Sequence, residues 1–301
     1  MTLVIRTRAL DGPIELVSAL PSRSGGPRSL LLHGEDGIVA SGVAARIPVG
    51  TGPERLRRAR EELARLARAS AVEDEVRVAG TGLVAMGSFT FDPCTEGSIL
   101  TIPRVLIGRR DGIAWRTEIS APGAEARTGG MTEPPIGDPD RVRFGGSTVP
   151  DGAWLRAVAV ALERIHAGGL EKVVLARDQL LWSRRPFDTD ALVARLHERF
   201  TGCHVFAVDG LVGASPELLL GKRGLDVRSR VLAGTAARGR GPDDHRLGSA
   251  LLESEKDRRE HALAVASVRD ALAPVCVRLD VPTAPEILRL PNVQHLATLV
   301  A

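Results

Sequence analysis

The amino-acid sequence predicts an α+β fold, layered as in α/β proteins, in a single domain spanning residues 1–301. Two observations support this class. The composition, 44% hydrophobic and 26% charged over 301 residues, is that of a globular chain able to bury a sizeable core. Short apolar runs bounded by turn residues dominate a β-rich part, residues 1–145, whereas helical spacing alternates with such runs over residues 146–301.

The β-rich part contains strand candidates at residues 29–33, 37–43, 83–91, 99–109 and 112–119. A helix is expected over residues 53–69, because Pro53 suits a first helical turn and Leu56, Leu63 and Leu66 share one face. Residues 122–140 are rich in glycine and proline and are expected to form an exposed loop. Nothing in this part points to catalysis.

The C-terminal part is expected to carry the chemistry. Helices are predicted at residues 151–167, 189–200 and 248–273, and strands at residues 172–182 and 203–209. The strand at 172–182 opens with Lys172, which is followed by Val173, Val174 and Leu175, and this apolar run predicts that the strand is buried.

A first candidate for chemistry is Glu217, which ends the segment GASPE. Pro216 lacks a backbone N–H and restricts Ser215 to extended geometry, so a turn into a strand is expected. The apolar residues on either side should partly desolvate the Glu217 carboxylate, which favours its protonated form and suits it to donate a proton. An ordinary solvated glutamate is the alternative.

A second candidate is the pair Gly234-Thr235, which follows the apolar run 231–233 and precedes the basic, glycine-rich residues 238–241. A glycine lets a ligand approach the backbone, and freed N–H groups can hold an anionic oxygen. A plain loop glycine is the alternative.

A third candidate is an acidic face on the helix at 248–273, where Glu253, Asp257 and Glu260 recur at helical spacing with His261 at the edge. Carboxylates on one face fit Mg²⁺, which proteins bind through one or two carboxylates together with waters and an anionic substrate group. A solvated face with an ordinary Lys256–Glu260 pair is the alternative.

Charge and hydropathy exclude some functions. The formal charge of +3 is mild and suits an anionic metabolite. Basic residues are dispersed and aromatics make up only 3% of the chain, so no nucleic-acid partner is expected. No stretch approaches the ~18 apolar residues of a membrane span, and the N-terminus lacks a signal-peptide pattern. We therefore expect a cytoplasmic protein that needs no membrane. We also expect it to act as a monomer.

The segments GASPELLL, LAGT and SEKDxxEH, with EKVVLAR upstream, together resemble those of the chorismate-utilising enzymes, and within them the isochorismate synthases. The resemblance runs from about Val149 to the C-terminus. It implies two large, mostly antiparallel sheets packed together with helices outside. It also implies an isomerase that converts chorismate to isochorismate with Mg²⁺, for menaquinone or siderophore biosynthesis.

The resemblance further implies residue roles. Lys172 matches the general base that activates the water attacking C2 of chorismate, and Glu217 matches the general acid that protonates the departing C4 hydroxyl. Glu260 matches a Mg²⁺ ligand. The matches to substrate contacts are Gly234, Thr235 and His295. Because a lysine is a base only when neutral, Lys172 needs desolvation or a nearby cation, for which the apolar run after it and Arg177 are candidates.

Two positions separate the subfamilies. Ala233 stands where similar aminodeoxychorismate synthases carry a nucleophilic lysine, which argues against that activity. Lys172 favours water over ammonia as the nucleophile, which argues against anthranilate synthase. Salicylate synthase, which adds a pyruvate elimination, stays open. So does a shortened, inactive homologue, since the resembling enzymes continue past the position of Ala301 with the last strands and a second Mg²⁺ glutamate.

Overall fold

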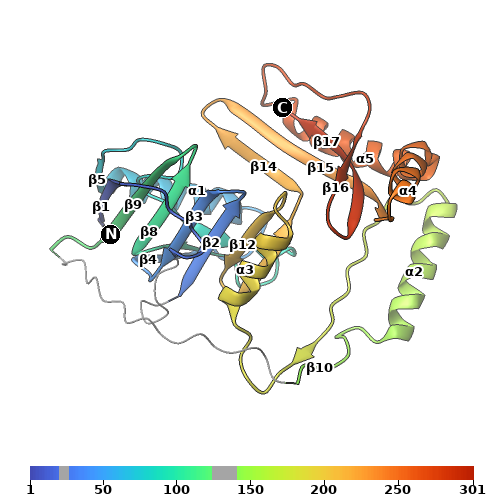
Figure 1. The fold of residues 1–301 in the computed structure, drawn as a ribbon, viewed down its shortest axis with the longest axis horizontal. Coiled ribbons are helices and arrows are strands. Elements are labelled where there is room, and N and C mark those ends of the chain that lie inside the picture. The colour runs from blue at the N-terminus through green and yellow to red at the C-terminus, as the bar shows by residue number, and fades with distance from the viewer. Residues whose placement is uncertain (20–26, 124–140) are drawn as a thin grey trace. The chain divides into compact units, whose positions relative to one another are not determined.

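The computed structural model describes residues 1–19, 27–123 and 141–301. The chain divides into two compact units. The first comprises Met1–Pro134 and Thr189–Pro216, and the second comprises Pro135–Asp188 and Glu217–Ala301. Residues 189–216 therefore fold with the N-terminal part of the chain (Figure 1). Most of the loop expected at 122–140 lies outside the described residues.

The first unit is built around an eight-stranded sheet of order β13-β12-β2-β3-β8-β9-β1-β5, with a smaller sheet β4-β7-β6. Its elements are β1 (Val4–Leu10), β2 (Arg28–His33), β3 (Asp36–Ser41), β4 (Ala45–Pro48), α1 (Arg55–Ala69), β5 (Ala71–Asp74), β6 (Met86–Ser88), β7 (Ile99–Ile102), β8 (Val105–Arg110), β9 (Ile113–Ser120), α3 (Thr189–Arg199), β12 (His204–Val208) and β13 (Leu211–Ser215). Among the described strands of the large sheet, β1 and β5 alone pair in parallel.

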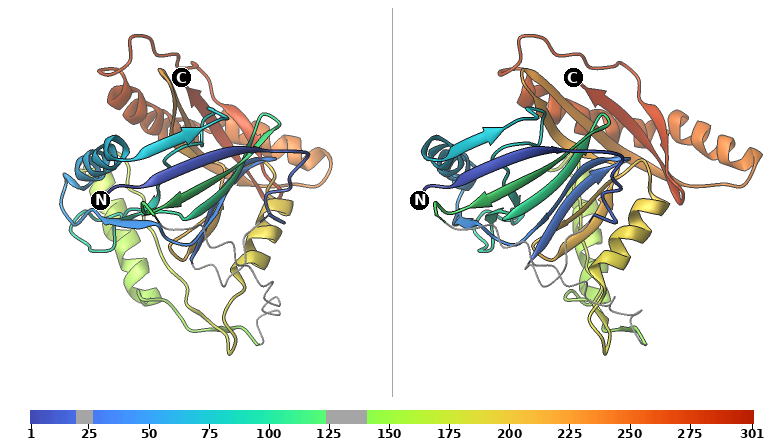
Figure 2. Two further views of the ribbon diagram at one scale, coloured as in Figure 1. Left: turned by 90° about the vertical axis from the view of Figure 1, so that its left-hand side faces the viewer. Right: turned by 60° about the vertical axis from the view of Figure 1, so that its left-hand side comes forward.

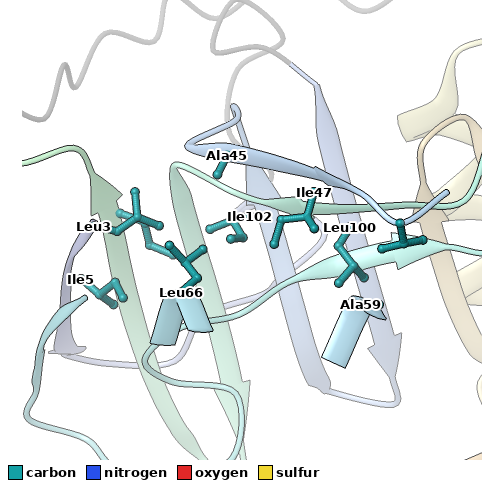
Figure 3. Close-up of a cluster of buried hydrophobic side chains, with 10 residues drawn as sticks. Leu3, Ile5, Ala45, Ile47, Ala59, Leu66, Leu100 and Ile102 are labelled. Atoms are coloured by element: carbon teal, nitrogen blue, oxygen red, sulfur yellow. The ribbon is translucent and has the colours of Figure 1, made fainter. Parts of the chain in front are cut away.

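Helix α1 forms where its apolar spacing predicted a helix, and it buries Leu66 and Ala59 in the largest core cluster of the first unit. Figure 3 shows Leu66 close to Ile5 of β1 and Ile102 of β7, and Ala59 close to Leu100 of β7. The strand expected at 99–109 is two strands, β7 and β8, which belong to different sheets. Pro103 lies between them and offers no N–H to a ladder, which explains the break.

The second unit is built around a four-stranded antiparallel sheet of order β14-β15-β17-β16, with a short β10-β11 pair. Its elements are β10 (Arg143–Phe144), α2 (Asp151–His166), β11 (Leu181–Trp182), β14 (Leu218–Arg223), β15 (Asp226–Ala237), α4 (Pro242–Glu253), α5 (Glu255–Leu272), β16 (Glu286–Arg289) and β17 (Val293–Val300). Helix α5 packs on β15 and β17 through Leu272, Val231 and Val300, and it runs along these strands in Figure 2.

The buried strand predicted at 172–182 is wrong except for its last two residues, which form β11. Val173, Val174 and Leu175 are 40%, 79% and 37% exposed, and residues 172–180 form no strand in the described structure. It is held instead at its far end, where Asp178 accepts hydrogen bonds from Ser147 Oγ and the Thr148 N–H. An apolar run predicts a strand only where neighbouring strands exist to pair with it.

The single helix predicted at 248–273 is also wrong, because the chain breaks into α4 and α5 at Ser254. Ser254 has extended backbone angles, and its hydroxyl oxygen accepts a hydrogen bond from the Asp257 N–H, which caps α5. A serine followed three residues later by an acidic residue is an N-terminal capping pattern, and this signal is present in the sequence.

The predicted α+β class with antiparallel sheets is confirmed. The two largest sheets belong to different units, and their packing against each other stays a prediction. Among the residues that the structure describes, no helix is both long and apolar enough to cross a membrane.

Candidate active site

Lys172 and Glu260 lie side by side in the second unit. Lys172 Nζ is 3.5 Å from Glu260 Oε1, and Glu260 Oε2 is 3.3 Å from Lys256 Nζ. The Lys172 side chain is 25% exposed and that of Glu260 is 34% exposed, so both are half-buried. They meet because the segment after α2 passes α5 at this point. The structure therefore places the predicted base beside the predicted metal ligand.

Thr235 and His295 form a second contact, across strands β15 and β17. They are direct partners in the register of this pair, and Thr235 Oγ1 is 2.9 Å from His295 Nδ1. Burial lowers the pKa of His295, and the negative charge of Glu217 acts in the opposite direction. The influence of Glu217 on the imidazole puts the predicted acid in the same neighbourhood as the two predicted substrate contacts.

The surroundings of Glu217 correct one expectation. The residue follows a bend at Pro216 between β13 and β14, as the sequence predicts, but it is exposed. Leu219 and Leu220 are 84% and 52% exposed because β14 is an edge strand of its sheet. The apolar run after Glu217 therefore does not desolvate the carboxylate, contrary to the prediction. The run is visible in the sequence, whereas its place at a sheet edge is not.

Gly234 lies within strand β15, not in a loop. The register between β15 and β17 shifts between Leu232 and Thr235, so the chain forms a bulge at this point. Gly234 has a φ of +85°, and a Cβ added there would lie 3.2 Å from atoms of both Asp257 and Leu296. The left-handed backbone and the close approach of α5 both favour glycine at this position, and the contact between Gly234 and a substrate stays a prediction.

His261 and Thr298 connect helix α5, which carries Glu260, to strands β15 and β17, which carry Thr235 and His295. Neither His261 nor Thr298 was predicted as a site residue from the sequence. His261 is only 3% exposed, although the sequence pattern predicts it at the edge of an exposed acidic face. Its Nδ1 is 3.1 Å from the Ala233 carbonyl oxygen and its Nε2 is 2.8 Å from Thr298 Oγ1. Its spacing to the partly or fully buried Val265, Val268 and Leu272 is the helical pattern that could have placed it inside.

The predicted acidic face is not formed, because Glu253 and Asp257 fall on different helices. Asp257 accepts a 2.5 Å hydrogen bond from the Ser254 hydroxyl, which lowers the pKa of its carboxyl, and it also pairs with Lys256. Over residues 1–19, 27–123 and 141–301, no three histidine, cysteine, aspartate or glutamate side chains converge as a metal site. Of the three carboxylates predicted on this face, Glu260 is the one that lies beside Lys172.

A cavity of about 280 Å³ in the first unit is separate from this candidate site. It is lined from β2, β3 and β12 and contains the Arg28–Asp190 ion pair, in which Nη2 and Oδ2 are 2.5 Å apart. None of the predicted site residues lines it. The chemistry-bearing residues all belong to the second unit.

The second unit thus presents an amine beside a carboxylate, and a hydroxyl and an imidazole near a second carboxylate. A neutral amine can remove a proton and a carboxylic acid can donate one. Hydroxyl and imidazole groups can hydrogen-bond the oxygen atoms of an anionic ligand. The set suits acid–base chemistry on a small oxygen-rich substrate.

Comparison with known proteins agrees with this description. A family model described as "Chorismate binding enzyme" matches residues 132–301. The chain is 30% identical to the isochorismate synthase MenF of Bacillus subtilis over 257 residues, which cover 75% of this chain and 54% of that protein. It is 40% identical to the salicylate biosynthesis isochorismate synthase of Pseudomonas aeruginosa over 152 residues, which cover 48% of this chain and 31% of that protein.

Among solved structures, the menaquinone-specific isochorismate synthase MenF of Escherichia coli superposes with a TM-score of 0.76 at 25% identity, covering 99% of this chain and 70% of that one. The chain spans about half the length of the curated relatives it matches, 54% of the first and 40% of the second. Since the family model covers more than half of the sequence and includes every predicted site residue, the chain belongs to the chorismate-binding enzyme family.

Proposed function

We propose that this protein is an isochorismate synthase, an isomerase that interconverts chorismate and isochorismate. Water adds at C2 of the ring and the C4 hydroxyl leaves as water, so substrate and product have the same composition. The observation that carries the proposal is the meeting of Lys172 and Glu260, two residues that the family resemblance assigns to one reaction, at 3.5 Å. The isochorismate synthases among the relatives support the same activity.

In this proposal, Lys172 takes the proton from the attacking water and Glu217 gives a proton to the departing hydroxyl. Each transfer needs its group in the opposite protonation state from the one it has in water at neutral pH. A substrate bound over the half-buried Lys172 side chain would exclude water from it and so favour its neutral amine. Thr235 and His295 would hydrogen-bond the substrate oxygens and fix the ring between acid and base.

Mg²⁺ has a limited place in the proposal. Glu260 is a carboxylate of the kind that Mg²⁺ accepts, and proteins often supply only one or two such ligands beside an anionic substrate. Glu260 would hold the ion together with waters and a substrate carboxylate. When bound, the ion would neutralise that carboxylate and orient the ring.

The setting of the reaction is also proposed. The matched proteins include a menaquinone-specific enzyme and one of salicylate biosynthesis, so we propose a role in menaquinone or siderophore biosynthesis. A cytoplasmic monomer that acts on chorismate without nucleic acid or membrane remains our expectation.

The test is a chromatographic assay of the purified chain with chorismate, with and without Mg²⁺, alongside calorimetric binding of chorismate. Metal-dependent formation of isochorismate is expected. Salicylate together with pyruvate would identify a salicylate synthase instead. A folded chain that binds chorismate but forms no product in either condition would contradict the catalytic proposal and favour the inactive homologue.

A further inference from the structure

The imidazole of His261 is held between two strands of the second unit. His261 follows Glu260 on α5 and is 3% exposed. One ring nitrogen, Nδ1, is 3.1 Å from the carbonyl oxygen of Ala233 on β15, and the other, Nε2, is 2.8 Å from Thr298 Oγ1 on β17. Both ring nitrogens therefore have partners within the protein.

The partners fix the proton on the ring. A carbonyl oxygen only accepts hydrogen bonds, so Nδ1 carries the hydrogen and donates it to Ala233. The Thr298 hydroxyl can either donate to Nε2 or accept from it. The contact with the Ala233 carbonyl is thus the one that requires a hydrogen on Nδ1.

The Ala233 carbonyl belongs to the bulge that immediately precedes Thr235. The register of β15 with β17 is interrupted between Leu232 and Thr235 and resumes with Thr235 opposite His295. A bulge takes backbone groups out of the ladder, and a buried carbonyl without a donor is unfavourable. His261 supplies that donor from the helix that also carries Glu260.

We propose that His261 is a positioning residue, which ties Glu260 on α5 to the bulge and thereby holds Thr235 against His295. His261 does not touch the reacting atoms in this scheme. It acts through two other residues. Glu260 precedes it in the sequence, and Thr235 is linked to it through the bulge that contains the Ala233 carbonyl. The effect on catalysis rests on the proposed function, whereas the effect on the bulge does not.

Two substitutions separate the hydrogen bonds. In His261→Asn the side-chain amide nitrogen lies near the position of Nδ1 and can still donate to Ala233, but the shorter side chain does not reach Thr298. In His261→Gln the amide lies near the position of Nε2, so it can satisfy Thr298 but not Ala233. Thr298→Val removes the hydroxyl at nearly constant volume. His245→Asn, on the exposed surface of α4, is the matched control.

The expected result is a difference between the two amides. His261→Gln should lower kcat for isochorismate formation by about 100-fold, the scale of a 1 Å misplacement, with a smaller change in KM. His261→Asn should restore most of that activity, and the control should match the unsubstituted chain. Amide hydrogen exchange over residues 231–237 should be faster in His261→Gln than in His261→Asn.

The exchange measurement separates this inference from the proposed function. If the unsubstituted chain forms no isochorismate, the function fails while faster exchange in His261→Gln still supports the tether. The inference is overturned if the two amide variants, both folded by circular dichroism, have the same exchange over 231–237. It is equally overturned if their reductions in kcat are equal and simply follow their melting temperatures.

Discussion

Lys172 Nζ and Glu260 Oε1 are 3.5 Å apart, so the proposed base and the proposed metal ligand form an ion pair with each other. The pair joins the segment after α2 to helix α5, and both side chains are only half-buried. A cation that binds Glu260 competes with Lys172 for the same carboxylate. Ligand binding at one of these residues therefore changes the surroundings of the other.

Lys172→Ala should lower isochorismate formation by about 10²–10⁴-fold, the usual contribution of a general base. The free energy of unfolding should change by less than about 1 kcal/mol, because the ion pair is partly exposed. Product chromatography and urea unfolding measure the two effects. The control is Lys256→Ala, which removes a lysine 3.3 Å from the same carboxylate but 80% exposed. Near-normal turnover in Lys172→Ala would refute the base assignment.

Glu217→Gln should lower turnover by about 10²–10⁴-fold and leave chorismate binding nearly unchanged, because the amide keeps the shape of the acid but cannot give up a proton. Single-turnover assays and calorimetry separate the two quantities. Glu163→Gln, at an exposed position on α2, makes the same chemical change away from the site. A Glu217→Gln variant that keeps most of its activity would rule out this residue as the acid.

Gly234→Ala should reduce the free energy of unfolding by about 2–4 kcal/mol, from left-handed backbone strain together with overpacking against Asp257 and Leu296. Gly224→Ala is the matched control, since Gly224 has a φ of +61° and no atom within 4 Å of the added Cβ. It should cost only about 1–2 kcal/mol. Equal destabilisation of the two variants in urea unfolding would show that α5 does not press on the bulge.

Ser254→Ala should destabilise the protein by about 0.5–2 kcal/mol, because α5 loses its N-terminal cap. Ser254→Asn keeps a capping side chain and should be destabilised much less. Thermal unfolding followed by circular dichroism compares the two. If both variants unfold alike, the hydrogen bond from the Asp257 N–H to the serine is not what ends α4 and begins α5.

Asp244 should make stability depend on pH in the acid range. Hydrogen bonds from Arg238 and from the Gly239 N–H, with the charge of Arg238, lower the pKa of Asp244 to about 2, whereas in the unfolded chain it is about 3.9. A carboxyl with a lowered pKa stabilises the fold above the unfolded value and loses this contribution as the pH falls from about 4 to about 2.

The measurement is the urea midpoint of the native protein and of Asp244→Asn, from a pH well above the unfolded pKa of Asp244 down to about pH 2, its folded value. Their difference should be largest above the unfolded pKa and should shrink as the pH falls toward the folded one. A difference that stays constant over this range would mean that the carboxylate charge is not the source of the stabilisation. Asp243→Asn, whose carboxylate pairs with the exposed Arg246, is the control.

Local pattern alone determined much of this protein. Apolar spacing placed α1 and α3 within one or two residues of their ends, and the order of the motifs indicated the family that the comparisons established. These features depend on residues close together in sequence, whose periodicity and turn chemistry are visible in one dimension. The candidates for base, acid and substrate contacts came from the resemblance of these motifs to the family, and their roles stay predictions.

Tertiary structure alone decided which of those residues meet. The run after Lys172 and the run after Glu217 look equally apolar, yet both are exposed, because burial depends on strands supplied by distant parts of the chain. The sequence places His261 on a charged surface, but α5 turns it beneath the sheet, between Ala233 and Thr298. Strand pairing and helix packing act between residues far apart in sequence, and these interactions built the site.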